Sequence, residues 1–211
     1  SAPSVAQDVK SQVETITKVV VDNKSNPAAI EDQVKDFVKE NKKNAEALAG
    51  LGRAFLEIKD TASAREYATM ALDRGKDNKG KALASILLGD LAALSSNEGG
   101  GAASYYNQAI HFDPTNPTGY IKYAAVYRKV DPEGAVAKLE ELRSVDPSYP
   151  VDAEAAHFFY GANKFDKAIE YYGKVDLNQL KENYLTEYAT AALLMADSKK
   201  SLEVSLFGVN K

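Results

Sequence analysis

The chain has 211 residues, of which 45% are hydrophobic and 27% are charged, and its formal net charge at pH 7 is −4. This composition excludes an intrinsically disordered chain, and no apolar stretch approaches the roughly 20 residues that a membrane-spanning helix needs. The lack of cysteine excludes disulfides, thiolate catalysis and cysteine-ligated zinc, and the acidic balance disfavours nucleic acid as a partner.

The first residues, from Ser1 to Gln7, contain no charged-then-apolar signal sequence. We interpret this start as what remains after removal of a signal peptide, which favours a periplasmic or secreted location, with a tag remnant as the alternative. Two helices are predicted next, over residues 9–23 and 28–41, because apolar residues recur there at helical spacing. We interpret residues 1–43 as a divergent N-terminal capping helix pair.

The stretch from Ala45 to Asn78 contains two further helical patterns in succession. Each places large apolar or small residues on one face, namely Leu48, Leu51, Gly52 and Phe55 in the first and Ala64, Ala68 and Ala71 in the second. We count positions in this unit so that Leu51 and Gly52 are at 7 and 8. Position 32, which is often proline in such units, is Lys76.

The same order of residues recurs at near-regular intervals along the chain. The residues at positions 7 and 8 of the following units are Leu88-Gly89, Tyr123-Ala124, Ala155-Ala156 and, in a truncated fifth unit, Tyr188-Ala189. Glycine and proline mark turns inside two units, over Ser95–Gly101 and Asp131–Gly134. We expect the small residues at position 8, Gly52 and Gly89 among them, to allow close approach of paired helices.

The repeating pattern resembles the tetratricopeptide repeat (TPR) family, from about residue 11 to the end of the chain. The resemblance implies an all-α fold, an alpha-alpha superhelix (TPR solenoid) of antiparallel helix pairs, with residues 44–211 forming four repeats plus the truncated fifth. It also implies a non-catalytic scaffold that binds a protein or peptide segment in a concave groove lined by the first helices. The alternative is a helical regulatory or targeting arm of a longer polypeptide, whose missing C-terminal region carries the activity.

By the same resemblance, certain first-helix positions face the groove. The candidate protein-binding residues are Arg53, Leu83, Ile86, Leu87, Asp90, Lys122, Arg128, His157 and Tyr160. We expect the three apolar residues among them to contact a partner segment. The three residues Arg53, Lys122 and Arg128 would orient an acidic residue of that partner.

Sharper chemical roles find little support in the sequence. His157 could be a ligand or a general base, but no acid pair adjoins it, so a surface or packing role is favoured. With one inserted residue allowed in the turn of the second unit, Tyr106 and Tyr172 occupy position 24, a packing position, which favours a core role over stacking on a ligand. We expect no catalytic set, metal or cofactor. A last helix from Ser201, with its apolar residues only partly covered, would allow self-association.

Overall fold

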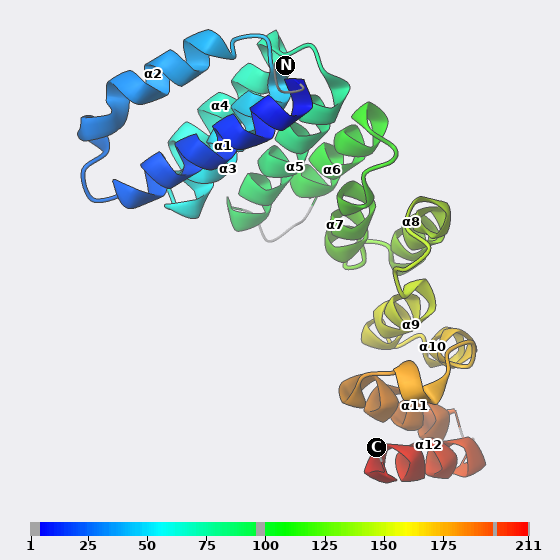
Figure 1. Cartoon of the computed structure of the whole chain (residues 1–211). Helices are drawn as coiled ribbons and strands as arrows, with labels where there is room; N and C mark the ends of the chain where they lie inside the picture. Colours follow the sequence, from blue (N-terminus) through cyan, green and yellow to red (C-terminus); the bar gives the residue numbers. More distant parts are fainter. Residues whose placement is uncertain (1–4, 96–99, 196–197, 211) are drawn as a thin grey trace. The chain divides into compact units, whose positions relative to one another are not determined.

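The computed structural model describes residues 5–95, 100–195 and 198–210, and all regular structure in these residues is helical (Figure 1). The all-α fold predicted from the repeat is confirmed. The first two helices are α1 (Val5–Asp22) and α2 (Glu31–Glu40), joined through the short 3₁₀ turn η1 (Pro27–Ile30). Among the described helices, none combines the length and the apolar character that crossing a bilayer requires.

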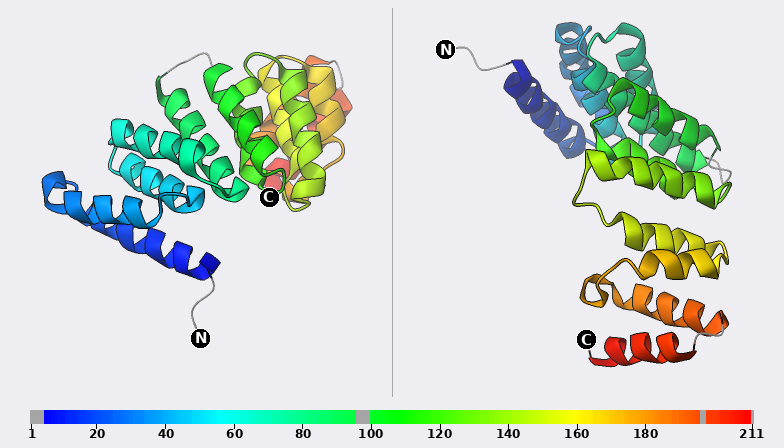
Figure 2. Two further views of the ribbon diagram at one scale, coloured as in Figure 1. Left: turned by 90° about the horizontal axis from the view of Figure 1, so that it is seen from above. Right: turned by 90° about the vertical axis from the view of Figure 1, so that its right-hand side faces the viewer.

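Five helix pairs follow, one for each predicted unit, and within a pair the second helix runs back along the first (Figure 2). Their bounds are α3 (Ala45–Glu57) and α4 (Thr61–Arg74), α5 (Asn78–Ser95) and α6 (Gly100–Phe112), α7 (Pro117–Tyr127) and α8 (Pro132–Val145), α9 (Val151–Gly161) and α10 (Phe165–Tyr172), and α11 (Glu182–Leu194) and α12 (Ser198–Asn210), with η2 (Leu177–Gln179) before α11. The turn predicted over residues 95–101 falls largely on residues 96–99, outside the described residues.

The chain divides into two compact units, residues 1–122 and residues 123–211. In the first of these, α1 packs against α3, and the boundary predicted at residue 43 stays a prediction. Val9 and Val20 of α1 belong to the same apolar core as Leu48 and Leu51 of α3. The capping role of the first helices stays a prediction.

In the first unit, a carboxylate joins the starts of two helices. Asp77 accepts hydrogen bonds from the backbone N–H groups of Ala45 at 2.7 Å and Glu46 at 3.0 Å, in the first turn of α3. It also accepts one from the N–H of Gly80, in α5, at 3.1 Å. These N–H groups have no partner within their own helices, so one side chain caps both helices.

The absence of proline at position 32 of this unit has a structural reason. The backbone N–H of Lys76 donates a hydrogen bond to the carbonyl oxygen of Lys43 at 3.0 Å. Proline has no N–H and could not form this bond between the two interhelical loops. Lys76 therefore links the loop before α3 to the loop before α5, next to the hydrogen bonds of Asp77.

The two position-8 glycines lie at close helix contacts, as predicted. A Cβ atom on Gly52 would lie 2.8 Å from Cδ2 of Leu87. On Gly89 it would overlap the ring of Tyr106 in the paired helix α6. Any side chain at either position would force these neighbours apart.

In the second unit, the core between α9 and α12 contains several tyrosines. Tyr172, Tyr184 and Tyr188 are all buried, together with Leu180 and Val204. The last helix is partly covered: Leu202 and Leu206 are 61% and 54% exposed, as expected, and Val209 is 84% exposed, but Val204, also expected to be only partly covered, is fully buried. Self-association through this helix stays a prediction.

Candidate functional site

The three apolar candidates on α5 are less accessible than expected. Ile86 is 3% exposed and Leu87 is fully buried, where it faces Gly52, and only Leu83 is partly exposed. The reason is that α5 packs against α3, α4 and α6, which cover most of its circumference. The expectation that Ile86 and Leu87 contact a partner is therefore corrected: they belong to the interior.

The charged candidates of the first unit form one cluster around Asp90. The side chain of Asp90 is 14% exposed, and its carboxylate pairs with Arg53 Nη1 at 2.7 Å and with Lys122 Nζ at 2.8 Å. The hydroxyl of Tyr106, which is itself buried, donates a third hydrogen bond at 2.6 Å. Three helix pairs thus supply groups to one carboxylate.

In this cluster the negative charge of Asp90 is compensated by two cations. Burial alone would raise the pKa of Asp90, but the hydrogen bonds from Lys122, Tyr106 and Arg53 hold that pKa below its usual value. Asp90 therefore stays ionised and forms ion pairs with both Arg53 and Lys122. An acidic partner residue approaching Arg53 or Lys122 would have to compete with a carboxylate that is already in place.

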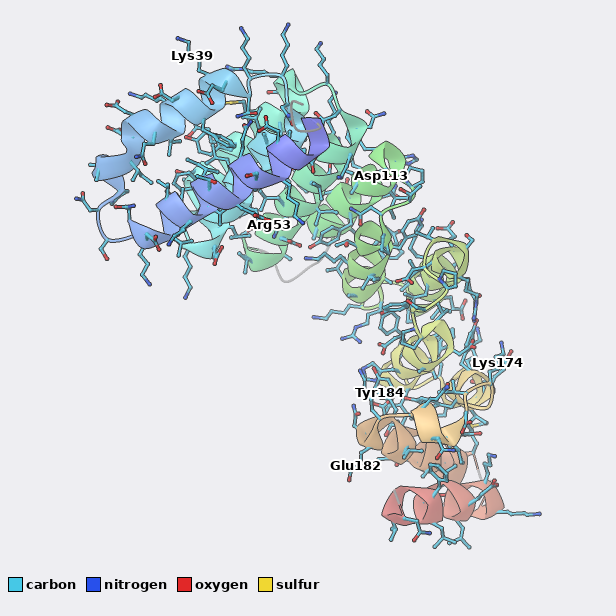
Figure 3. All side chains as sticks on the ribbon, in the orientation of Figure 1. Lys39, Arg53, Asp113, Lys174, Glu182 and Tyr184 are labelled. Carbon is cyan, nitrogen blue, oxygen red and sulfur yellow. The ribbon has the colours of Figure 1, made fainter. Side chains whose placement is uncertain are left out.

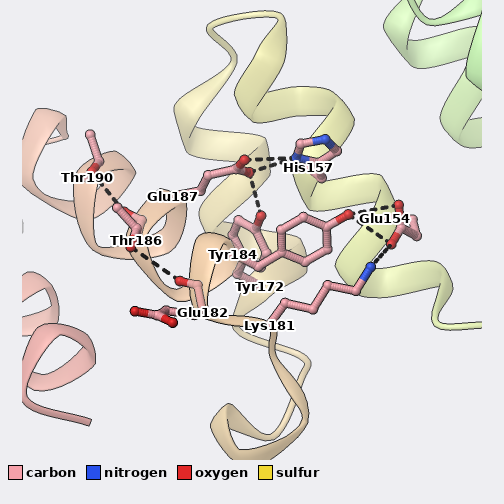
Figure 4. A network of polar contacts seen from close by, with 9 residues as sticks. All are labelled: Glu154, His157, Tyr172, Lys181, Glu182, Tyr184, Thr186, Glu187 and Thr190. Atoms are coloured by element: carbon pink, nitrogen blue, oxygen red, sulfur yellow. Dashed lines mark hydrogen bonds and ion pairs between the residues drawn. The ribbon is translucent and has the colours of Figure 1, made fainter. Parts of the chain in front are cut away.

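His157 in the second unit has a carboxylate partner that the sequence analysis missed. Its Nδ1 lies 2.9 Å and 3.0 Å from the two carboxylate oxygens of Glu187 on α11 (Figure 4). The hydroxyl of Tyr172 donates to Glu187 at 2.7 Å. The signal was the repeat itself, since His157 is at position 9 of its unit and Glu187 at position 6 of the next.

A second carboxylate follows along the same face. The hydroxyl of Tyr184 donates to both oxygens of Glu154, at 2.9 Å and 3.0 Å, and Lys181 Nζ lies 4.0 Å from Glu154 (Figure 4). The ring of Tyr184 stacks on His157 with the centroids 4.8 Å apart. Burial, and then the charge of Glu154, raise the pKa of Tyr184, so it remains a neutral donor.

The predicted packing role of the two position-24 tyrosines is confirmed, with an addition. Tyr106 is 3% exposed and Tyr172 is fully buried. Burial raises the pKa of both, and the hydrogen bond to a carboxylate raises it further. Each tyrosine therefore packs its ring in the core, and its hydroxyl donates a hydrogen bond to a carboxylate on a first helix.

Arg128 lines a pocket of about 400 Å³ within the second unit. The residues around it come from the end of α7, the start of α8 and α9, and are Arg128, Lys129, Pro132, His157, Phe158, Gly161 and Ala162. The guanidinium of Arg128 lies over the ring of Phe158, 5.0 Å from its centroid. Tyr160 is not among the lining residues and packs edge-on against Phe165 at 5.5 Å.

The polar groups of the candidate site are hydrogen-bond donors and acceptors. Across the described stretches, no three histidine or acidic side chains are placed to hold a metal ion. The only imidazole in the site has its Nδ1 directed at Glu187. The tyrosine hydroxyls already donate to carboxylates of the chain, as do Arg53 and Lys122, whereas the guanidinium of Arg128 lies against an aromatic ring.

The comparison with solved structures bears on the fold. The TPR protein TTC0263 of Thermus thermophilus aligns with 88% of this chain and 99% of its own length, at 19% identity and a TM-score of 0.50. The chain has the tetratricopeptide repeat fold. No protein-family model matches the sequence, and no curated protein matches it.

Two further structures with this fold align over most of the chain. PilF of Pseudomonas aeruginosa covers 94% of this chain and 91% of its own, at 16% identity and a TM-score of 0.60. MamA of Desulfovibrio magneticus RS-1 covers 79% and 93%, at 18% identity and a TM-score of 0.61. The TPR resemblance noted from the sequence is thus confirmed for the fold.

Proposed function

We propose that this chain is a non-catalytic TPR scaffold that mediates protein–protein interaction. A protein or peptide segment would bind on the surface formed by the first helices, where the resemblance places a concave groove. The observation that supports this most is the pocket beside α9, where hydrogen-bond donors from consecutive helix pairs converge. Arg128 packs on the ring of Phe158. His157 is held by Glu187 and by the ring of Tyr184, so both side chains are positioned by the fold.

Selection of dodecapeptides from a displayed random library on the full chain tests this proposal. Peptides that bind should protect amides of α7, α9 and α11 from hydrogen exchange and leave those of α8 and α10 unchanged. Protection confined to the second helices would place binding on the other face. A library that yields no binding peptide would contradict the scaffold role.

The alternative is a regulatory or targeting arm of a longer polypeptide that carries the activity elsewhere. The apolar face of α12 favours it, because Leu202, Leu206 and Val209 recur at helical spacing and are exposed. The same face would serve self-association. Sedimentation of the chain tests whether a second copy covers this face. The full sequence of its gene tests whether a further part of the polypeptide does.

We also propose a periplasmic or secreted location, on the basis of the N-terminal sequence alone. Fractionation of cells that express the gene with its natural start tests this directly. Recovery with the cytosolic fraction would contradict it.

A further inference from the structure

Arg128 differs from the other cations predicted to meet a partner. Arg53 and Lys122 both pair with Asp90. Arg128 forms no ion pair with any described residue, and neither does its neighbour Lys129, so the positive charge at this point is unbalanced. The contact of Arg128 with Phe158 covers one face of the guanidinium and leaves its N–H edges available.

The pocket beside Arg128 has room for a ligand. Gly161, the last residue of α9, lines it, and a Cβ atom built on Gly161 would meet nothing within 4 Å. The glycines of the tight helix contacts, such as Gly89, have no such space. A side chain at Gly161 would therefore extend into open space at the wall of this pocket.

The chemistry of the pocket wall is mixed. Phe158, Pro132 and Ala162 provide apolar surface, whereas Arg128 and Lys129 provide charge. His157 lines the same pocket and is fixed through Nδ1 by Glu187. An amino acid side chain with a short apolar stem and a carboxylate end matches this arrangement.

We infer that this pocket binds the carboxylate of a partner's aspartate or glutamate side chain, with Arg128 as its main hydrogen-bond donor. This inference rests on the proposed scaffold function and specifies the chemistry of its partner. A planar guanidinium held against an aromatic ring can donate two parallel hydrogen bonds to one carboxylate. Lys129 adds charge at the rim and increases the association rate.

A peptide is favoured over a nucleic acid because acidic side chains lie close to the basic groups of this pocket. Glu187 lies within hydrogen-bond distance of His157, and Glu154 is on the same helix, α9. A phosphate backbone would bring several charges past these acids, whereas one carboxylate avoids them. The overall charge of −4 acts in the same direction.

The test uses acidic dodecapeptides selected on the parent chain, each compared with a copy in which one acidic residue is changed to its amide. We expect one acid-to-amide change per peptide to weaken binding about tenfold, the effect of one charge-assisted hydrogen bond. Arg128→Gln should weaken the acidic peptide to the same extent. It should leave the affinity of the amide copy unchanged, since the two changes remove the same interaction.

Gly161→Met gives an independent measure, because it fills the pocket while Arg128 keeps its charge. It should weaken the acidic peptides, whereas its matched control, Gly101→Met on α6, should not. Gly101 also has nothing within 4 Å of a built Cβ atom, so both variants should fold. Thermal unfolding of the two variants checks that point.

The outcomes separate the inference from the function on which it rests. Peptides that bind the first helices but tolerate Arg128→Gln and Gly161→Met would overturn the inference and leave the scaffold function in place. The absence of any binding peptide would overturn both. Binding of single-stranded DNA that exceeds peptide binding and depends on Arg128 would replace the inferred partner with a nucleic acid.

Discussion

The two compact units differ in the groups that surround a carboxylate on a first helix. In the first unit, Asp90 pairs with two cations and accepts a hydrogen bond from a tyrosine, so its negative charge is compensated within the fold. Glu187 in the second unit is met by His157 and Tyr172, and the nearby cation Arg128 stays unpaired. The comparison shows a carboxylate paired with two cations in the first unit, and in the second a cation, Arg128, that has no ion-pair partner among the described residues.

The tyrosines show how one repeat position produces both arrangements. Tyr106 on α6 donates to Asp90 on α5, the first helix of its own pair. Tyr172 on α10 donates to Glu187 on α11, the first helix of the next pair. The tyrosine at this repeat position therefore links the two helices of one pair in the first unit and two consecutive pairs in the second. Figure 3 labels Arg53 in the first region and Tyr184 in the second.

The largest expected effect contrasts two glycines. Gly89→Leu should lower the free energy of unfolding by about 3 kcal/mol, because the new side chain overlaps the ring of Tyr106 and displaces it from Asp90. Gly161→Leu, the matched change, should alter it by less than about 0.5 kcal/mol. Urea denaturation followed by circular dichroism measures both. Equal losses would show that the two regions do not differ in packing.

A smaller effect compares the two tyrosine hydroxyls. Tyr172→Phe should cost about 2 kcal/mol, because Glu187 retains only His157 as a close partner. Tyr106→Phe should cost about 1 kcal/mol, since Asp90 keeps both of its cations. Paired denaturation curves decide the order. A larger loss for Tyr106→Phe would contradict the view that the first cluster is the better balanced one.

The next effect depends on pH. The pKa of Asp90 is lower in the folded chain than in the unfolded chain. Its carboxylate therefore stabilises the fold above the unfolded-state pKa of about 3.9, and this contribution is lost as the pH falls through the folded-state pKa. Asp90→Asn should be less stable than the parent by about 1 kcal/mol near neutral pH.

The same variant should approach the parent in stability as the pH is lowered from about 5 through the folded-state pKa of Asp90, which lies below its unfolded value. Denaturation midpoints across this range measure the difference. A constant gap between parent and variant would mean that the charge of Asp90 is not what stabilises the cluster.

The smallest effect concerns the cations. Arg53→Gln should cost about 0.5 kcal/mol, since its side chain is 47% exposed and solvent weakens the pair with Asp90. Arg128→Gln should change stability even less, because no ion pair is lost. A melting temperature for Arg128→Gln equal to that of the parent would support the view that Arg128 is not needed for folding and is available to bind a partner. A clear loss would show that Arg128 contributes to the fold instead.

The repeat allowed the helix pairs and their order to be predicted from sequence, because position-dependent small and apolar residues report packing directly. Gly52 and Gly89 were located in this way. The buried state of Ile86 and Leu87 was missed, since facing a groove and facing a neighbouring helix differ only by how closely the next pair packs. The ion pair of Arg53 with Asp90 was missed because both were taken to face a partner, although each is at position 9 of consecutive units and the repeat brings them together.

Asp77 couples the stability of consecutive helix pairs in the first unit. Other acids at comparable turns, Asp113, Asp146 and Asp176, accept hydrogen bonds from residues two positions later in the chain. Asp77 instead holds N–H groups of α3 and α5 together. Melting of α5 would remove the cap of α3, so these pairs should open together in hydrogen exchange, as one cooperative block.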